Sequence, residues 1–102
     1  MPEFDKVLQE IKGQLIQKFH PSKVILFGSV AKGIFKETSD IDLCVVQDTD
    51  NKRQLLTDMY VEIESDVPFD IVLYTNKEWD ECVKDTAAFA YQINNAGVTI
   101  YG

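Results

Sequence analysis

The sequence predicts an α/β protein in which helices pack on a small mixed β-sheet. Segments with apolar residues at helical spacing alternate with short, β-rich apolar runs, and this alternation is typical of a layered α/β fold. The 102 residues leave room for one hydrophobic core, so we expect residues 1–102 to form a single domain. The predicted elements are, in order, a helix over 3–19, strands over 23–27 and 40–46, a helix over 51–65, a strand over 69–74, a helix over 79–96 and an edge strand formed by V-T-I-Y near the end.

The first helix and the first strand are marked by apolar residues and by the residues that end them. The helix is expected to stop before Pro21, because the residue ahead of a proline avoids the α region. The run K-V-I-L-F at 23–27 is typical of a strand covered on both faces, and Gly28 ends it. Apolar residues three or four positions apart form one stripe on the helix: Phe4, Val7, Leu8, Ile11, Leu15 and Phe19.

The later elements are also marked by their apolar spacing and by the residues that begin or end them. In the second helix the apolar residues Leu55, Met59 and Ile63 recur every four positions. Pro68 introduces the strand F-D-I-V-L-Y, and Gly97 is expected just past the C-terminal end of the third helix.

The composition excludes several classes of protein. Aspartate and glutamate outnumber lysine and arginine by 17 to 10, for a formal net charge of −7. No basic stripe is visible, so we expect no direct binding of nucleic acid. No apolar run approaches the roughly 20 residues of a membrane span, and the charged N-terminus is unlike a signal peptide. Cys44 and Cys82 lack metal-site spacing, so we expect reduced thiols, one in a strand and one in a helix, and a cytoplasmic protein.

Two aspartates begin the strand over 40–46. Aspartate is uncommon in strands, and the period of two places Asp40 and Asp42 on the same face. Like charges repel unless a cation lies between them, and magnesium commonly takes one or two carboxylates together with substrate phosphates. A metal site is one interpretation, and a solvated strand end with a turn at Ser39 is the other.

A third aspartate, Asp70, lies inside the apolar strand over 69–74. A charged side chain at such a position is costly if it is buried without a partner. If this strand lies beside the strand over 40–46, Asp70 completes a cluster of three carboxylates. Taken alone, Asp70 fits better as a strand-edge residue that faces water.

The turn G-S-V-A-K-G follows the first strand. Gly28 permits close approach of the backbone, and Ser29 opens a short helical turn whose N–H groups and positive end suit a phosphate. Lys32 adds a positive charge nearby. An ordinary strand-to-helix turn is the alternative, and the Walker A pattern is absent. Combined with the three aspartates, the turn supplies what a two-metal phosphoryl or nucleotidyl transfer site requires.

The turn and the aspartates together resemble the signature of a known family. G-S-V-A-K-G followed by S-D-I-D-L is similar to the signature of the DNA polymerase β-type nucleotidyltransferases, above all their minimal prokaryotic members, the MNT proteins. The resemblance implies a polymerase β-like fold, ATP as substrate, two magnesium ions that manganese can replace, and a catalytic metal on Asp70. By motif it assigns catalysis and metal binding to Asp40, Asp42 and Asp70, and nucleotide binding to Gly28, Ser29 and Lys32.

The resemblance also implies a partner. MNT proteins usually act beside a helical HEPN-domain protein, as antitoxins that transfer AMP from ATP to a tyrosine of the toxin. Larger transferases of the superfamily carry an extra domain for the acceptor, so we expect this chain to take its acceptor site from another chain or from a self-dimer. Two alternatives stay open: a nucleotidyltransferase with a small-molecule acceptor, and a non-catalytic module that neutralises its partner by contact.

Other conspicuous residues are expected to be structural. His20 lies at the end of the first helix and is expected to cap it. Trp79, Phe89 and Tyr91 are expected to pack within a helix rather than to stack on a base. The apolar pair Ile34-Phe35 is expected in the core or in a partner surface.

Overall fold

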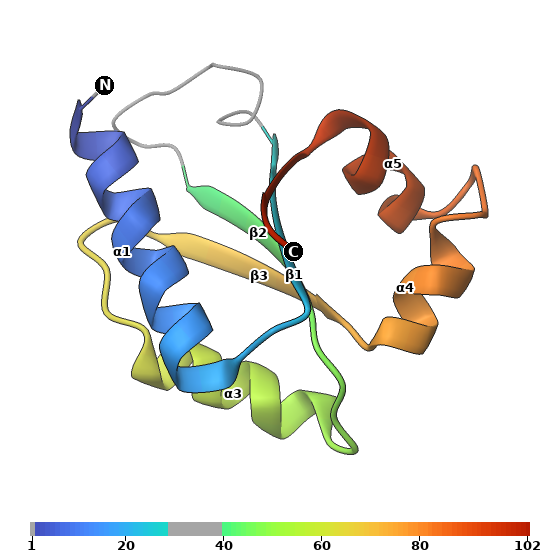
Figure 1. Cartoon of the computed structure of the whole chain (residues 1–102), viewed down its shortest axis with the longest axis horizontal. Coiled ribbons are helices and arrows are strands. Elements are labelled where there is room, and N and C mark those ends of the chain that lie inside the picture. Colours follow the sequence, from blue (N-terminus) through green and yellow to red (C-terminus); the bar gives the residue numbers. More distant parts are fainter. Residues whose placement is uncertain (1, 29–39) are drawn as a thin grey trace.

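The computed structural model describes residues 2–28 and 40–102, in which helices lie on both faces of one mixed sheet (Figure 1). This confirms the predicted α/β class. The described elements are α1 (Pro2–Phe19), β1 (Lys23–Phe27), β2 (Ile41–Val46), α3 (Lys52–Glu62), β3 (Phe69–Tyr74), α4 (Asn76–Cys82), α5 (Phe89–Ala96) and β4 (Val98–Tyr101).

The strand order in the sheet is β3-β2-β1-β4, so β3 and β4 form its two edges. β1 runs antiparallel to β2 and to β4, whereas β2 and β3 run parallel. A parallel pair requires a crossover connection, and the segment containing α3 supplies it. The predicted mixed sheet and the predicted edge strand near the end of the chain are both confirmed.

The sheet buries side chains on both faces, as its apolar strands predict. On one face Leu43 and Val45 of β2 pack with α1 and α3. On the other face Cys44 and Val46 pack with α4 and α5. Figure 1 shows α1 and α3 on one side of the sheet and α4 and α5 on the other. Because strand side chains alternate with a period of two, Asp42 shares the face that α4 and α5 cover.

The predicted helix over 79–96 is wrong, because two shorter helices occupy this part of the chain. α4 begins early because Thr75 and Glu78 form a capping box: Thr75 Oγ1 accepts from the Glu78 N–H (3.2 Å), and Glu78 Oε1 accepts from the Thr75 N–H (2.9 Å). Between the helices the Asp85 carboxylate accepts from the Ala87 N–H (3.0 Å) and stabilises a turn. Such local hydrogen bonds interrupt a helix even where the apolar spacing continues.

Two helix ends show why particular residues stand there. His20 has a φ of 55°, and its N–H donates to the Ile16 carbonyl (3.2 Å), so it ends α1 as the predicted cap. Gly97 ends α5 at the predicted place, but with an extended φ of −82°. A Cβ on Gly97 would lie 2.6 Å from the Ile93 carbonyl oxygen, so the glycine is needed for space.

The remaining differences are small. α3 is shorter at both ends than the predicted helix over 51–65, and β2 begins one residue later than predicted. Cys44 in β2 and Cys82 in α4 are both free, as predicted. Burial raises the pKa of the Cys44 thiol to about 12, so this thiol is unreactive at neutral pH.

Candidate active site

Asp42 and Asp70 lie directly opposite each other on neighbouring strands. In the parallel pair β2–β3, the register aligns Asp42 with Asp70 near the start of both strands. Both side chains lie on the face that α4 and α5 cover farther along the strands, since Cys44 and Tyr74, at even offsets from them, belong to that cluster. The prediction that the two aspartate-bearing strands are neighbours is confirmed.

The aspartates lie toward solvent. Asp40 and Asp70 are exposed and Asp42 is partly buried. No charged side chain is buried anywhere in the part of the chain that the structure describes. Asp70 therefore faces water, as the alternative interpretation of this residue expected, and no burial cost requires a partner for it. Its strand position leaves it open to a ligand from solution.

The negative charges of Asp40 and Asp70 both act on the carboxyl group of Asp42. Partial burial raises the pKa of the Asp42 carboxyl, and the charges of Asp70 and Asp40 raise it further. This coupling is what opposes ionisation when carboxylates share a site without a cation. A cation would relieve the repulsion, and hard carboxylate oxygens suit magnesium.

The described side chains do not by themselves form a complete metal site. Within residues 2–28 and 40–102, no three histidine, cysteine or acidic side chains are gathered closely enough to hold a metal ion. The three aspartates are thus coupled in charge, but the expected cluster of three carboxylates within metal-holding distance is not found among the described residues. Magnesium commonly keeps waters and substrate phosphates beside one or two carboxylates, so the donor set still fits a metal bound together with nucleotide. Metal binding by Asp40, Asp42 and Asp70 remains a prediction.

Gly28 brings the backbone against the carboxylate of Asp42. It follows Phe27, which pairs with Asp42 in the antiparallel β1–β2 ladder, and it has a φ of 81°. A Cβ on Gly28 would collide with Oδ2 of Asp42. The expected nucleotide-binding residues Ser29 and Lys32, and the pair Ile34-Phe35, lie outside the described residues.

Tyr60 contacts the strand that carries Asp70, and the sequence did not reveal this contact. Its hydroxyl accepts a hydrogen bond from the Ile71 N–H (2.7 Å), and its ring stacks on Phe69, with centroids 5.5 Å apart and planes at 12°. Tyr60 therefore holds the residues on both sides of Asp70. An aromatic residue next to the core residue Met59 is the signal in the sequence, but nothing in that signal indicates a contact with β3.

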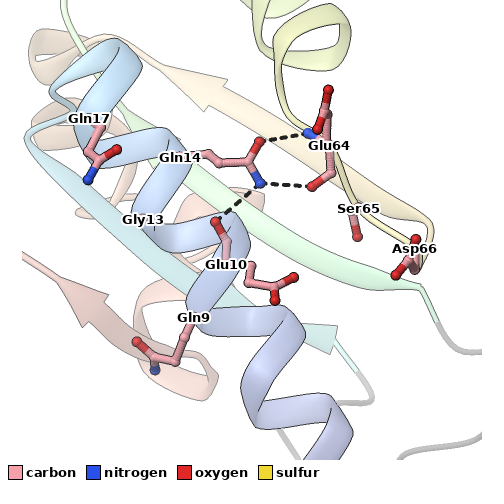
Figure 2. Close-up of a pocket in the computed structure, with 8 residues that line it drawn as sticks. All are labelled: Gln9, Glu10, Gly13, Gln14, Gln17, Glu64, Ser65 and Asp66. Atoms are coloured by element: carbon pink, nitrogen blue, oxygen red, sulfur yellow. Dashed lines mark hydrogen bonds between the residues drawn. The ribbon is translucent and has the colours of Figure 1, made fainter.

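A separate hollow lies away from the aspartates. It has a volume of about 440 Å³ and lies between α1 and the loop after α3, on the face opposite Asp42. Figure 2 shows Gln14 reaching across to the backbone of Glu64, where its amide nitrogen donates to the carbonyl (2.8 Å) and its oxygen accepts from the N–H (2.7 Å). None of the three aspartates lines this hollow.

Comparison with known proteins identifies a family for this chain. The sequence model of the nucleotidyltransferase domain matches residues 8–94, which include the aspartates, Gly28 and most of the sheet. The chain belongs to the nucleotidyltransferase domain family. Members of this family generally use a nucleoside triphosphate and divalent metal ions.

Two relatives agree with this membership. The chain is 42% identical over 48 residues to a Methanocaldococcus jannaschii protein named "Putative protein adenylyltransferase"; the match spans 45% of this chain and 48% of that protein. A solved structure titled "Crystal structure of putative nucleotidyltransferase" shares 28% identity, with a TM-score of 0.53, over 76% of this chain and 87% of the other. The predicted nucleotidyltransferase fold is confirmed. Among the described helices, none is both long and apolar enough to cross a membrane.

The contact between Tyr60 and β3 gives a first testable prediction. Tyr60→Phe keeps the ring but leaves the Ile71 N–H without its acceptor, so the free energy of unfolding should fall by about 1 kcal/mol. The rate of nucleotidyl transfer should fall as well, because Asp70 is less firmly positioned. Urea denaturation and a transfer assay measure both effects. Tyr101→Phe, on the edge strand β4, is the matched control, and equal losses in the two variants would contradict a special role for Tyr60.

Proposed function

We propose that this nucleotidyltransferase domain transfers AMP from ATP to a hydroxyl of a partner protein, a tyrosine of a HEPN-domain toxin, and so acts as a cytoplasmic antitoxin. The observation that carries the proposal is the register of Asp42 with Asp70 near the start of β2 and β3, with Gly28 against Asp42. The name of the Methanocaldococcus jannaschii relative supports a protein acceptor.

The site residues would have two roles, binding the triphosphate and binding the metal ions. Gly28, Ser29 and Lys32 would hold the triphosphate, with backbone N–H groups and one positive charge. Asp40, Asp42 and Asp70 would hold two magnesium ions, which manganese could replace. When bound, the ions would supply positive charge to the phosphate oxygens and relieve the repulsion felt at Asp42.

The reaction is a displacement at the α-phosphorus. The acceptor hydroxyl oxygen forms a bond to the α-phosphorus, the bond to the oxygen that bridges the α- and β-phosphorus breaks, and pyrophosphate leaves with that electron pair. Asp70 accepts the hydroxyl proton and returns it to solvent. Because Asp70 is exposed, a hydroxyl on another macromolecule can reach it. The main task of the protein is to hold the reactants in line.

The acceptor is proposed to be a protein because the carboxylate edge is open. An exposed edge admits a tyrosine on a flexible segment, whereas a free sugar or antibiotic needs walls that orient it. Such walls could come from a second copy of this chain, which would favour a small-molecule acceptor. The net charge of −7 disfavours a nucleic-acid acceptor.

The test is to mix the chain with its HEPN-domain partner, ATP and magnesium. We expect the partner to gain the mass of one AMP on a tyrosine, and no gain when EDTA removes the metal. Asp42→Asn should bind the partner and leave its mass unchanged. Asp80→Asn, an exposed aspartate on α4, is the matched control and should modify the partner normally.

Two outcomes would contradict the proposal. If the chain neutralises its partner without modifying it, and Asp42→Asn does so equally well, the chain is a binding module. If AMP appears on a small hydroxyl compound and never on the protein, the acceptor assignment is wrong.

A further inference from the structure

A second, smaller hollow adjoins Gly28 on the same face as Asp42. It has a volume of about 160 Å³ and lies between the end of β1 and α5, which Figure 1 shows beside each other. Pockets for whole small molecules hold roughly 300–1,000 Å³, so this hollow suits one ring system rather than a whole nucleotide. The described residues that line it are Phe27, Gly28, Phe89, Gln92, Ile93 and Ala96.

The wall is aromatic and open to solvent. Phe89 is 49% exposed, so the expectation that it packs within a helix is only partly met. Its ring meets Phe27 edge-to-face, with centroids 5.5 Å apart and planes at 85°. Such a pair leaves ring surface on which a flat, apolar ring can stack. Trp79, by contrast, is buried against Tyr74, as expected of a packing residue.

Among the described residues, one polar side chain lines the hollow. Gln92 lies on α5, one turn after Phe89, and its amide carries both a donor and an acceptor. A glutamine amide pairs with adenine through two hydrogen bonds, one to the exocyclic amine and one to a ring nitrogen. Guanine presents a carbonyl oxygen in place of that amine, so the two purines would be distinguished.

Gly28 lies between the hollow and the carboxylate of Asp42. It lines the hollow, and it also lies against the carboxylate of Asp42. A nucleotide whose phosphates lie beside Asp42 can therefore place its base on the other side of Gly28 without crossing the sheet.

We infer that the hollow between β1 and α5 is the nucleobase subsite of this transferase, with Phe89 as the stacking residue and Gln92 as the residue that selects adenine. This inference rests on the proposed function, because it takes the ligand to be a nucleoside triphosphate. It adds a recognition element for the base to a site whose aspartates act only on the phosphates.

The test compares ligands with and without a base. Calorimetry with magnesium measures the binding of ATP, GTP and inorganic tripolyphosphate to the wild type and to three variants. Phe89→Ala should weaken ATP binding by about tenfold, the usual effect of removing one stacking residue, and leave tripolyphosphate binding unchanged. Gln92→Ala should bring the ATP and GTP affinities closer together. Val98→Ala is the control, because Val98 is also 49% exposed but lies on β4 outside the hollow.

The outcomes separate this inference from the function on which it rests. Binding of ATP to Phe89→Ala with wild-type affinity would overturn the subsite. An equal loss of ATP and tripolyphosphate would also overturn it, because the residue would then act on the phosphates or on the fold. If the wild type binds neither ATP nor tripolyphosphate, the proposed function is wrong, whatever the variants show.

Discussion

Replacing Gly28 with alanine is expected to abolish nucleotidyl transfer and to lower the free energy of unfolding by about 2 kcal/mol. Gly28 has a φ of 81°, which an alanine adopts only with strain. Its Cβ would also collide with Oδ2 of Asp42, so the carboxylate must turn away from its position beside Gly28. Strain lowers the stability, and displacement of Asp42 removes the activity. Urea denaturation and the AMP-transfer assay measure the two effects.

Gly13 provides the matched control. It lies inside α1, and a Cβ added there would meet nothing within 4 Å. Gly13→Ala should therefore stabilise the protein by about 1 kcal/mol through its better helix propensity and leave transfer unchanged. Equal stability of Gly28→Ala and the wild type would mean that the backbone at Gly28 tolerates a side chain.

Asp42→Asn is expected to lower the rate of transfer by roughly a thousandfold, since metal-assisted charge stabilisation contributes several kcal/mol to such reactions. The variant should still fold, because asparagine keeps the shape of the side chain. Without metal it should be more stable than the wild type at neutral pH, since it removes one charge from a repulsive group.

The pH dependence of that difference follows from linkage. The pKa of Asp42 is raised in the folded state, so the folded protein binds more protons there than the unfolded chain. The destabilisation is absent below the unfolded pKa and fully present above the raised folded pKa. The advantage of Asp42→Asn should thus appear as pH rises through this interval and vanish in acid. Melting curves from acid to neutral pH measure it, with Asp80→Asn as control. Loss of cooperative melting in Asp42→Asn would show that Asp42 is structural.

The strands were the most predictable elements. β1 and β3 match the predicted ranges 23–27 and 69–74, because Gly28 ends one apolar run and Pro68 precedes the other. The end of α4 was not predictable in the same way. Apolar spacing continues through 79–96, whereas the break depends on hydrogen bonds of a few polar side chains, which compete with the helix only in their folded positions.

The candidate site was predictable in its residue types and not in its contacts. A period of two and an unusual aspartate in a strand were enough to select Asp42 and Asp70. Two contacts join segments that are apart in the chain: that of Gly28 with Asp42, and that of Tyr60 with β3. Both contacts depend on which elements become neighbours in the fold. The exposure of Phe89 likewise depends on where α5 stands relative to β1.

The contact between Tyr60 and Ile71 also bears on self-association. β3 is an edge strand, and an outward N–H on an edge is a template for a strand of another molecule. Here the Ile71 N–H is already bound to a hydroxyl, and Phe69 is already stacked. The residue that contacts the strand of Asp70 thus also occupies an N–H group on the edge of that strand. Losing it should show first as concentration-dependent aggregation, before any loss of the folded monomer.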